Sequence, residues 1–334
     1  MRCVVTGGAG FIGSHLVERL IEHGGNVTVL DNLKTGRRSN LEPALRTGRA
    51  TFVQMDVAGS ISEMATLFRD AAVVYHIGGL ADIVPSIERP DDYFRANVDG
   101  SYAVAEAARL AGVPKLVYAA SSSCYGTPDA FPTPESAELR PQYPYALTKI
   151  LGEQIVLHWG AVYGTVTTSL RLFNVYGPRA RTSGTYGAVF GVFLAQKLAG
   201  KPFTVVGDGT QTRDFTFVSD VVAAFELAAQ RSTGGIYNVG SGAPQSINRL
   251  VELLGGETQH IPKRPGEPDC TFADTTRIQR KLGWSPTVSF EEGVRAMVDG
   301  IEAWRDAPVW DAEAIAAATR VWFERLGTPQ GAAV

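Results

Sequence analysis

The 334-residue sequence has only three cysteines, no excess of basic residues and no long apolar run. Cys3, Cys124 and Cys270 are too few and too scattered for a disulfide framework or a zinc site, so we expect a reducing compartment and no metal. The formal net charge of −3 gives no support for a nucleic-acid or membrane partner. No apolar run reaches transmembrane length, and the start M-R-C-V-V-T-G-G lacks a signal-peptide layout. We therefore expect a soluble, cytoplasmic protein.

The first half of the chain alternates apolar runs of strand length with amphipathic stretches of helix length. The expected strands cover residues 2–6, 26–30, 51–55, 72–76, 115–119 and 166–172. The expected helices cover residues 11–23, 60–70, 93–111 and 144–163. This alternation predicts an α/β fold of the doubly wound type, in which a parallel sheet carries helices on both faces.

The pattern changes after about residue 175, where proline and glycine become frequent. The expected short strands and helices of this part cover residues 186–199, 203–206, 214–217, 219–230, 236–239, 246–254 and 290–305. We interpret residues 175–334 as a smaller, mixed α/β substrate lobe, from which segments such as 213–230 could pack back on the first half. The tail after Pro308 has its own helix signal, with Asp311 as cap, and could dock on the body or on a second subunit.

A glycine-rich loop, T-G-G-A-G-F-I-G, lies between the first expected strand and the first expected helix. Gly7 would permit a tight turn, Gly10 would let a pyrophosphate approach the backbone, and Gly13 would allow close helix–strand packing. The N-terminus of the helix would then face the phosphates. Asp31 ends the second strand, where a carboxylate accepts from the adenosine ribose and disfavours a 2′-phosphate. We therefore predict a NAD-binding domain of the Rossmann type over residues 1–174; a purely structural turn is the alternative.

Two further observations bear on this prediction. Arg37 and Arg38 lie close to Asp31 in the sequence and would suit NADP instead of NAD. Each of six consecutive expected strands is followed by a small or polar residue, and in a parallel sheet these residues would form one continuous binding edge. They are Gly7, Asp31, Asp56, Gly78 with Gly79, Ser121 and Asn174.

Tyr145 and Lys149 lie four residues apart in Y-A-L-T-K, on one face of the expected helix 144–163. A phenol is a poor base at neutral pH, but a nearby cation would lower the pKa of Tyr145. Tyr145 could then accept a hydroxyl proton while hydride leaves the same carbon, with Ser121 holding the reacting oxygen. A surface lysine beside a half-buried tyrosine is the alternative.

Six motifs, taken together, carry a resemblance to a known family. They are T-G-G-A-G-F-I-G, S-S-S-C-Y-G, Y-A-L-T-K, R-L-F-N-V-Y-G-P, R-D-F-T-F-V-S-D and R-P-G-E. In their order and spacing, from residue 2 to about residue 300, the chain resembles the extended short-chain dehydrogenase/reductases that act on nucleotide sugars. It is most similar to the NAD-dependent 4-epimerases of the UDP-galactose and UDP-glucuronate types.

The resemblance implies epimerisation at C4 of a nucleotide sugar, with a UDP-sugar favoured, through a transient 4-keto intermediate. Tyr145 would take the proton of the 4-hydroxyl, Ser121 would hold the oxygen, and Lys149 would bind the nicotinamide ribose. The implied cofactor residues are Gly7, Gly10, Phe11, Ile12, Gly13, Asp31, Asn32, Asp56, Val57, Ile77, Gly78, Asn97, Tyr145 and Lys149. The implied substrate residues are Ser122, Ser123, Phe173, Asn174, Arg181, Arg213, Arg264, Glu267 and Thr271.

Several of these substrate residues take individual roles from the resemblance. Arg213 and Arg264 would hold the diphosphate, because planar guanidinium groups suit phosphate oxygens, and Glu267 would accept from the nucleotide ribose. Thr271 stands where a bulky side chain would exclude N-acetyl groups, so its small size leaves room. Arg181 best matches an arginine that meets a uronate carboxylate in some relatives; an exposed loop arginine is the alternative.

Serines stand where related enzymes carry acids. Related 4,6-dehydratases have aspartate and glutamate at the positions of Ser122 and Ser123, and related decarboxylases have glutamate at the second of these. A serine hydroxyl cannot act as a carboxylic acid does at neutral pH, which argues against dehydration and decarboxylation. Oxidation and reduction at C4 are the reactions that remain possible. The alternatives to an epimerase are a 4-keto-sugar reductase or dehydrogenase with exchanging cofactor, and a non-catalytic dinucleotide-binding sensor or scaffold. By the same resemblance, helices 93–111 and 144–163 would form a homodimer.

Overall fold

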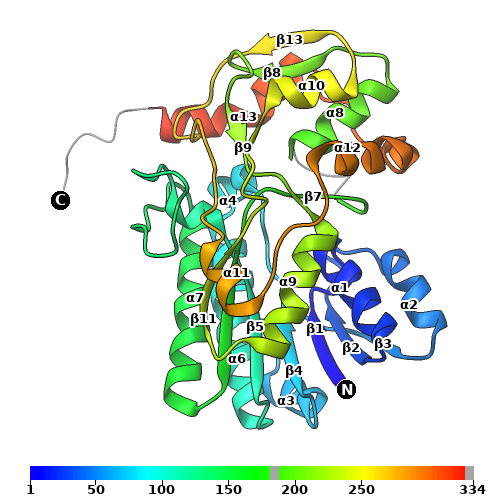
Figure 1. Cartoon of the computed structure of the whole chain (residues 1–334), viewed down its shortest axis with the longest axis vertical. Coiled ribbons are helices and arrows are strands. Elements are labelled where there is room, and N and C mark those ends of the chain that lie inside the picture. The colour runs from blue at the N-terminus through cyan, green and yellow to red at the C-terminus, as the bar shows by residue number, and fades with distance from the viewer. Residues whose placement is uncertain (181–187, 328–334) are drawn as a thin grey trace.

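The computed structural model describes residues 1–180 and 188–327. Its centre is a seven-stranded sheet in which all neighbouring strands run parallel (Figure 1). In spatial order the strands are β11 (Gly235–Val239), β6 (Val166–Leu172), β5 (Lys115–Ser121), β4 (Val73–His76), β1 (Arg2–Thr6), β2 (Asn26–Asp31) and β3 (Ala50–Gln54). The order reverses between β1 and β4, and ligands bind at the carboxyl ends of the strands at such a switch point.

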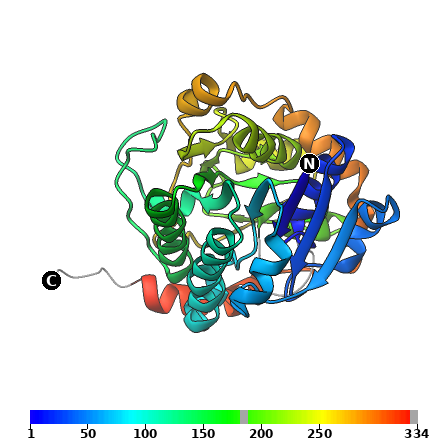
Figure 2. The ribbon, with the colours of Figure 1, turned by 90° about the horizontal axis from the view of Figure 1, so that it is seen from below.

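Helices cover both faces of this sheet (Figure 2). One face carries α1 (Phe11–Glu22), α2 (Glu42–Arg46), α9 (Val218–Arg231) and α11 (Thr276–Leu282). The other face carries α3 (Ile61–Phe68), α6 (Gly100–Leu110) and α7 (Pro144–Tyr163). Successive side chains of β1 point to opposite faces of the sheet. Val5 packs under the helices of the first face, and Val4 packs under those of the second. The predicted doubly wound sheet is confirmed, and burial of both faces explains why strands such as β1 and β4 are mostly apolar.

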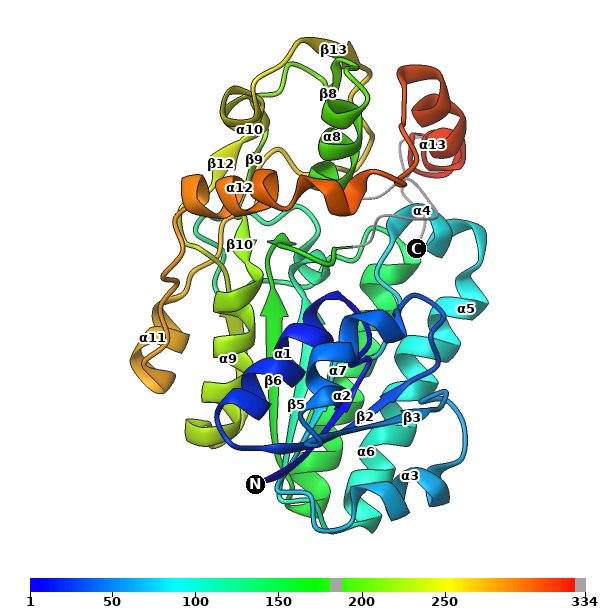
Figure 3. The same cartoon turned by 90° about the vertical axis from the view of Figure 1, so that its right-hand side faces the viewer.

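A smaller lobe stands over the carboxyl edge of the sheet (Figure 3). Its paired strands are β8 (Phe203–Val206) with β13 (Thr258–Ile261), β7 (Val175–Tyr176) with β10 (Thr216–Phe217), and β9 (Thr212–Arg213) with β12 (Gln245–Ser246). Its helices are α8 (Val189–Leu198), α10 (Ile247–Leu254), α12 (Phe290–Asp299), the 3₁₀ turn η4 (Ile301–Trp304) and α13 (Ala312–Leu326). An aromatic cluster holds the lobe together, with the Tyr176 and Phe190 rings stacked at 4.5 Å.

The helix predicted for residues 93–111 is present, but it starts earlier and is not α-helical throughout. The chain forms α5 (Pro90–Phe94), then a π-helical turn, η2 (Arg95–Asp99), and only then α6. A π turn takes in one extra residue, which a helical pattern in the sequence does not reveal, and such turns are frequent at functional sites. Here the turn carries Asn97. The remaining short elements are η1 (Arg38–Leu41), α4 (Ile83–Glu88) and η3 (Ser122–Tyr125).

Two expectations for the second half also need correction. The strand expected at 214–217 is divided, because the buried carboxylate of Asp214 turns aside to accept from the backbone amides of Ser241, Gly242 and Ala273. The strand expected at 236–239 lies in the main sheet beside β6 and not in the second lobe. In the same region α9 packs on α1, and the division into domains at residue 174 stays a prediction.

The tail helix expected after Pro308 is confirmed as α13. The Asp311 carboxylate accepts from the backbone N–H of Ala314 at 2.8 Å and so caps the helix.

A buried ion pair fixes α7 to the sheet. Arg171 on β6 donates to both oxygens of Glu153 on α7, at 2.6 and 3.1 Å, and both side chains are almost completely buried. Arg171 also donates to the Tyr125 hydroxyl at 2.9 Å. The helix can approach closely because residue 152 is glycine, where a Cβ would lie 2.5 Å from the Tyr118 hydroxyl.

We expect Glu153→Gln to lower the free energy of unfolding by about 3–5 kcal/mol, because it leaves the Arg171 charge buried without its partner. Urea unfolding measures this loss. Glu42→Gln is the matched control, since its ion pair with Arg46 is solvent-exposed and should contribute little. Equal effects of the two substitutions would contradict the importance of the buried pair.

Candidate active site

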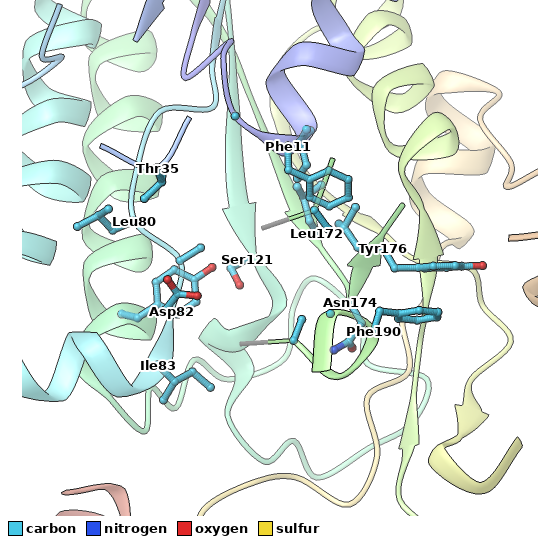
Figure 4. Close-up of a pocket in the computed structure, with 18 of the residues that line it drawn as sticks. Phe11, Thr35, Leu80, Asp82, Ile83, Ser121, Leu172, Asn174, Tyr176 and Phe190 are labelled. Carbon is cyan, nitrogen blue, oxygen red and sulfur yellow. The ribbon is translucent and has the colours of Figure 1, made fainter. Parts of the chain in front are cut away.

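A cavity of about 800 Å³ lies between the carboxyl edge of the sheet and the second lobe (Figure 4). It is lined by residues at, or just after, the carboxyl ends of six parallel strands, namely Gly7, Asp31, Asp56, Gly78, Gly79, Ser121 and Asn174. The structure thus brings these strand ends together, as the sequence pattern indicated. The other expected residues that line it are Gly10, Phe11, Ile12, Gly13, Asn32, Val57, Ile77, Ser122, Ser123, Tyr145, Arg213, Arg264 and Glu267. Asn97, Lys149, Phe173 and Thr271 lie behind its surface, and Arg181 lies outside the described residues.

The loop between β1 and α1 forms a cradle with no room for side chains. Gly7 has a φ of +69°, and a Cβ there would lie 2.6 Å from the Cα of Gly78. A Cβ at Gly13 would lie 2.2 Å from the Gly7 carbonyl oxygen. No side chain caps α1, whose N-cap is Gly10, so its first amides are available to a ligand in the cavity. This cradle fits the diphosphate of a dinucleotide.

Asp31 is the buried acid at the end of β2. Its Oδ2 accepts from the Ala9 amide at 3.0 Å and its Oδ1 from the Leu33 amide at 2.8 Å. Burial raises the pKa of Asp31, and the two amides partly offset that shift. A carboxylate oxygen has two lone pairs, so each can still accept from a ribose hydroxyl. Of the two neighbouring arginines, Arg37 lines the cavity, whereas Arg38 lies 5.1 Å from the centre of an aromatic ring.

Ser121, Tyr145 and Lys149 come together where β5 ends against α7. Ser121 lies near the Tyr145 phenol and lowers the pKa of that phenol, and the Ser121 Oγ accepts from the Ser123 amide at 3.2 Å. The Nζ of Lys149 lies 4.3 Å from the centre of the Tyr118 ring, in a buried cation–π contact. The arrangement can therefore hold a substrate hydroxyl between a serine and a tyrosine.

Burial dominates the acid–base properties of these residues. It raises the pKa of Tyr145, against the hydrogen bond from Ser121, and it lowers the pKa of Lys149 to about 7. We expected Lys149 to lower the pKa of Tyr145, but in the protein without cofactor the pKa of Tyr145 is raised. Burial disfavours both the Tyr145 phenolate and the Lys149 ammonium. A further positive charge is needed to favour the phenolate.

Asn97 supports the site from behind the cavity. Its Oδ1 accepts from the Leu80 amide at 2.8 Å, and its Nδ2 donates to the Leu80 carbonyl and to the Thr148 hydroxyl, both at 3.0 Å. The π turn thereby ties the loop after β4 to α7. Gly79 is needed in that loop, since a Cβ there would lie 2.6 Å from the Asn97 Oδ1. Asn97 thus positions the cavity wall, and its direct contact with a cofactor stays a prediction.

A second charged group lies at the other end of the cavity, contributed by β9 and the loop after β13. Arg213 donates to the Glu267 Oε1 at 2.8 Å, and Arg264 lies 3.5 Å from the Glu267 Oε2. All three side chains are mostly buried. Two arginines around one glutamate leave net positive charge, which suits an anionic ligand.

Two expected substrate residues serve neighbouring side chains. Phe173 packs against the Tyr125 ring, with 6.1 Å between the ring centres. Thr271 donates to the Asn174 Oδ1 at 2.7 Å and accepts from the Asp214 amide at 2.9 Å. Thr271 therefore orients Asn174, which does line the cavity, and its role as a size filter stays a prediction.

Among the cavity-lining side chains that sequence reasoning missed, Asp82 and Trp322 stand out. Asp82 precedes α4 without capping it, and the carboxylate points into the cavity as Ser121 does (Figure 4). Its charge adds to the raised pKa of Tyr145. Trp322 reaches the same cavity from α13. An aspartate before a helix is typical of a cap, and a tryptophan in a tail helix is typical of packing, so neither carried a local signal.

Two negative findings apply to the described ranges, residues 1–180 and 188–327. They contain no group of three or more histidine, cysteine or acidic side chains that could hold a metal ion. They also contain no helix of the length and apolarity needed to span a membrane.

The fold and the site agree with what comparison shows. Residues 3–240 match the model of the NAD dependent epimerase/dehydratase family, so the chain belongs to that family. A curated relative, the UDP-glucose 4-epimerase of Mycolicibacterium smegmatis, is 38% identical over 308 residues, which cover 90% of this chain and 98% of that protein.

Two solved structures illustrate the likeness in three dimensions. The UDP-glucose 4-epimerase of Thermotoga maritima, solved with UDP-glucose, has a TM-score of 0.84 and 33% identity, covering 91% of this chain and 99% of that one. The UDP-glucuronic acid 4-epimerase of Bacillus cereus, solved with UDP-glucuronic acid and NAD, has a TM-score of 0.84 and 30% identity, covering 90% and 99%. The resemblance stated from the motifs, the NAD cofactor and the epimerase class are confirmed.

We expect Ser121→Ala and Asp82→Asn to shift the pH–rate profile in opposite directions. The Ser121 hydrogen bond lowers the pKa of Tyr145, so its loss should move the rising limb to higher pH. The Asp82 charge raises that pKa, so its removal should move the limb to lower pH. The measurement is kcat/KM for UDP-glucose across neutral and alkaline pH. Shifts of the same sign would contradict the assignment.

Proposed function

We propose that this protein epimerises C4 of a UDP-linked sugar in the cytoplasm, with NAD tightly held. The observation that carries the proposal is that Ser121 and Tyr145 line one cavity with the glycine cradle and the Arg213–Glu267 pair. The cavity volume of about 800 Å³ suits two large ligands that meet at the catalytic pair. Free, unpaired thiols at all three cysteines are in keeping with a reducing compartment.

Binding of the substrate depends on the second lobe. Arg213 and Arg264 would place their guanidinium groups on the diphosphate, where bidentate hydrogen bonds are strong. The Oε2 of Glu267 is buried and makes no hydrogen bond within the described residues, so it is available to the ribose hydroxyls of the nucleotide. These contacts hold the parts of the substrate that do not react.

NAD, when bound, would take up a hydride from C4 and later return it, and its positive nicotinamide ring would favour the Tyr145 phenolate. Tyr145 accepts the proton of the C4 hydroxyl, and the Ser121 hydroxyl donates to the same oxygen. Lys149 lies one helical turn from Tyr145, and its ammonium suits a ribose hydroxyl of the cofactor. When the carbonyl at C4 is reduced, Tyr145 gives the proton back, so the enzyme ends as it began.

The chain offers no acid at Ser122 or Ser123 for a further step. Both serines line the cavity. Neither hydroxyl can exchange a proton with a sugar carbon near neutral pH as a carboxyl group can. The 4-keto sugar can then only be reduced, from the original face or, after turning, from the other one.

We expect Tyr145→Phe to reduce turnover of UDP-glucose by at least about a hundredfold, because the proton acceptor is lost. The bound NAD should remain, since the cradle is formed by other residues. Conversion to UDP-galactose measures turnover, and ultraviolet absorbance of the denatured protein measures NAD.

Wild-type protein should convert UDP-glucose with no net formation of NADH, without loss of water or CO₂ from the sugar. Steady NADH formation would show a dehydrogenase with exchanging cofactor instead. Full turnover by Tyr145→Phe would overturn the catalytic assignment.

The homodimer expected through the helices 93–111 and 144–163 is part of this proposal. The alanines of α6 are mostly buried inside the subunit, so they do not face a second copy. Large apolar side chains remain exposed on the same two helices, and these support a contact with a second copy. They are Tyr102 and Leu110 on α6, and Leu147, Val162 and Tyr163 on α7.

We expect Leu110→Glu to convert a dimer into a monomer, because it places a charge in an apolar contact. Sedimentation velocity measures the mass, and circular dichroism verifies the fold. Val309→Glu is the matched control, since Val309 is exposed on the tail. A monomeric wild type, or an undisturbed dimer of Leu110→Glu, would remove α6 from the interface.

A further inference from the structure

The C-terminal helix α13 crosses from the second lobe to the first. It lies against α4, the short helix that begins directly after the cavity residue Asp82 (Figures 1 and 3). Three side chains of the helix are buried, Ile315, Thr319 and Trp322, whereas Phe323 is partly exposed to solvent. The helix therefore presents one face to the body of the protein at the entrance to the substrate cavity.

Trp322 is the largest of these buried side chains, and its surroundings are polar as well as aromatic. It is 4% exposed and lines the cavity, yet it belongs to none of the hydrophobic clusters formed by the described residues. A tryptophan that serves packing alone would be expected in such a cluster. Its position needs another explanation.

The contacts of Trp322 go to the loop that carries the expected diphosphate-binding arginine. The indole Nε1 donates to the Pro265 carbonyl at 2.8 Å, and the Arg264 guanidinium lies 5.6 Å from the ring centre. The indole ring thus holds Arg264 through a cation–π contact, and the indole N–H holds the next residue, Pro265, through a hydrogen bond. Arg264 in turn pairs with Glu267 at 3.5 Å.

A second set of contacts joins Trp322 to the catalytic tyrosine. The Trp322 and Tyr143 rings lie 6.3 Å apart, and Tyr143 stacks on Tyr145 at 6.3 Å with an interplanar angle of 7°. The ring of Trp322 therefore lies between the loop that holds the charged group and the residues that begin α7. One side chain of the tail reaches both ends of the substrate site.

We propose that α13 is a working part of the substrate site, and that Trp322 is a positioning residue which holds Arg264 for the diphosphate of a nucleoside diphosphate sugar. The inference rests on the proposed function only for the identity of the ligand. A diphosphate binds to a guanidinium that is already placed, because less conformational freedom is lost on binding. Without the indole, the loop at 264–267 would have to be ordered by the ligand itself.

The test compares Trp322→Ala, Trp322→Phe and Phe323→Ala in the NAD-loaded protein. Calorimetry with UDP, which has the diphosphate and nucleoside but no sugar, measures the effect directly. We expect Trp322→Ala to weaken UDP binding about tenfold. This fold-change corresponds to the free energy of one cation–π contact that is shielded from water. Trp322→Phe keeps a ring but loses the indole donor, so its loss should be smaller. Phe323→Ala, the neighbouring exposed position, should bind as the wild type does.

Kinetics distinguish positioning from a general loss of structure. For Trp322→Ala, KM for UDP-glucose should rise in proportion to the loss of UDP affinity, kcat should change much less, and the bound NAD should be unchanged. Unchanged UDP affinity in Trp322→Ala and Trp322→Phe would overturn the inference, as would equal weakening by Phe323→Ala. UDP binding needs no turnover. If the wild type binds UDP but fails to epimerise, the proposed function fails and this inference does not.

Discussion

The buried ion pair between Glu153 and Arg171 determines where the chemistry takes place. It joins α7 to β6 in surroundings from which water is excluded, so neither partner can be lost without a large cost. Tyr145 lies about two helical turns before Glu153, which brings its phenol level with the end of β5. Ser121 is the last residue of β5. The approach of Tyr145 to Ser121 is thus a consequence of how α7 is fastened to the sheet.

The same burial leaves the free protein a poor acid–base catalyst. It disfavours the Tyr145 phenolate and lowers the pKa of Lys149 to about 7, and Asp82 adds a negative charge that opposes ionisation further. A cationic ligand reverses this balance, since a positive charge close to the phenol favours its ionised form. Under the proposed mechanism, cofactor bound in the glycine cradle would favour ionisation of Tyr145 and so the proton transfer.

The sequence predicted those parts of the molecule in which the physical cause is local. Gly7 and Gly13 are needed by one turn, and the strands of the sheet are apolar because both faces are buried. The π turn that carries Asn97 left no pattern, because its neighbours read as an ordinary helix. Asp82 and Trp322 depend on packing between segments far apart in the sequence, and neither position has a distinctive neighbour. Their roles appear only when α4 and α13 are placed together.

The two ends of the cavity are built for different tasks. At the nucleotide end, Arg213, Arg264 and Glu267 form a tight charged cluster, and Trp322 holds one member of it from behind. Interactions there are equal in the ground state and the transition state, so they retain the substrate without favouring one face of the sugar. At the other end, Ser121, Tyr145 and the Asp82 carboxylate line the cavity. Under the proposed function, a 4-keto sugar held by its diphosphate would turn while it stays bound, which an epimerase requires and a site that gripped every hydroxyl would prevent.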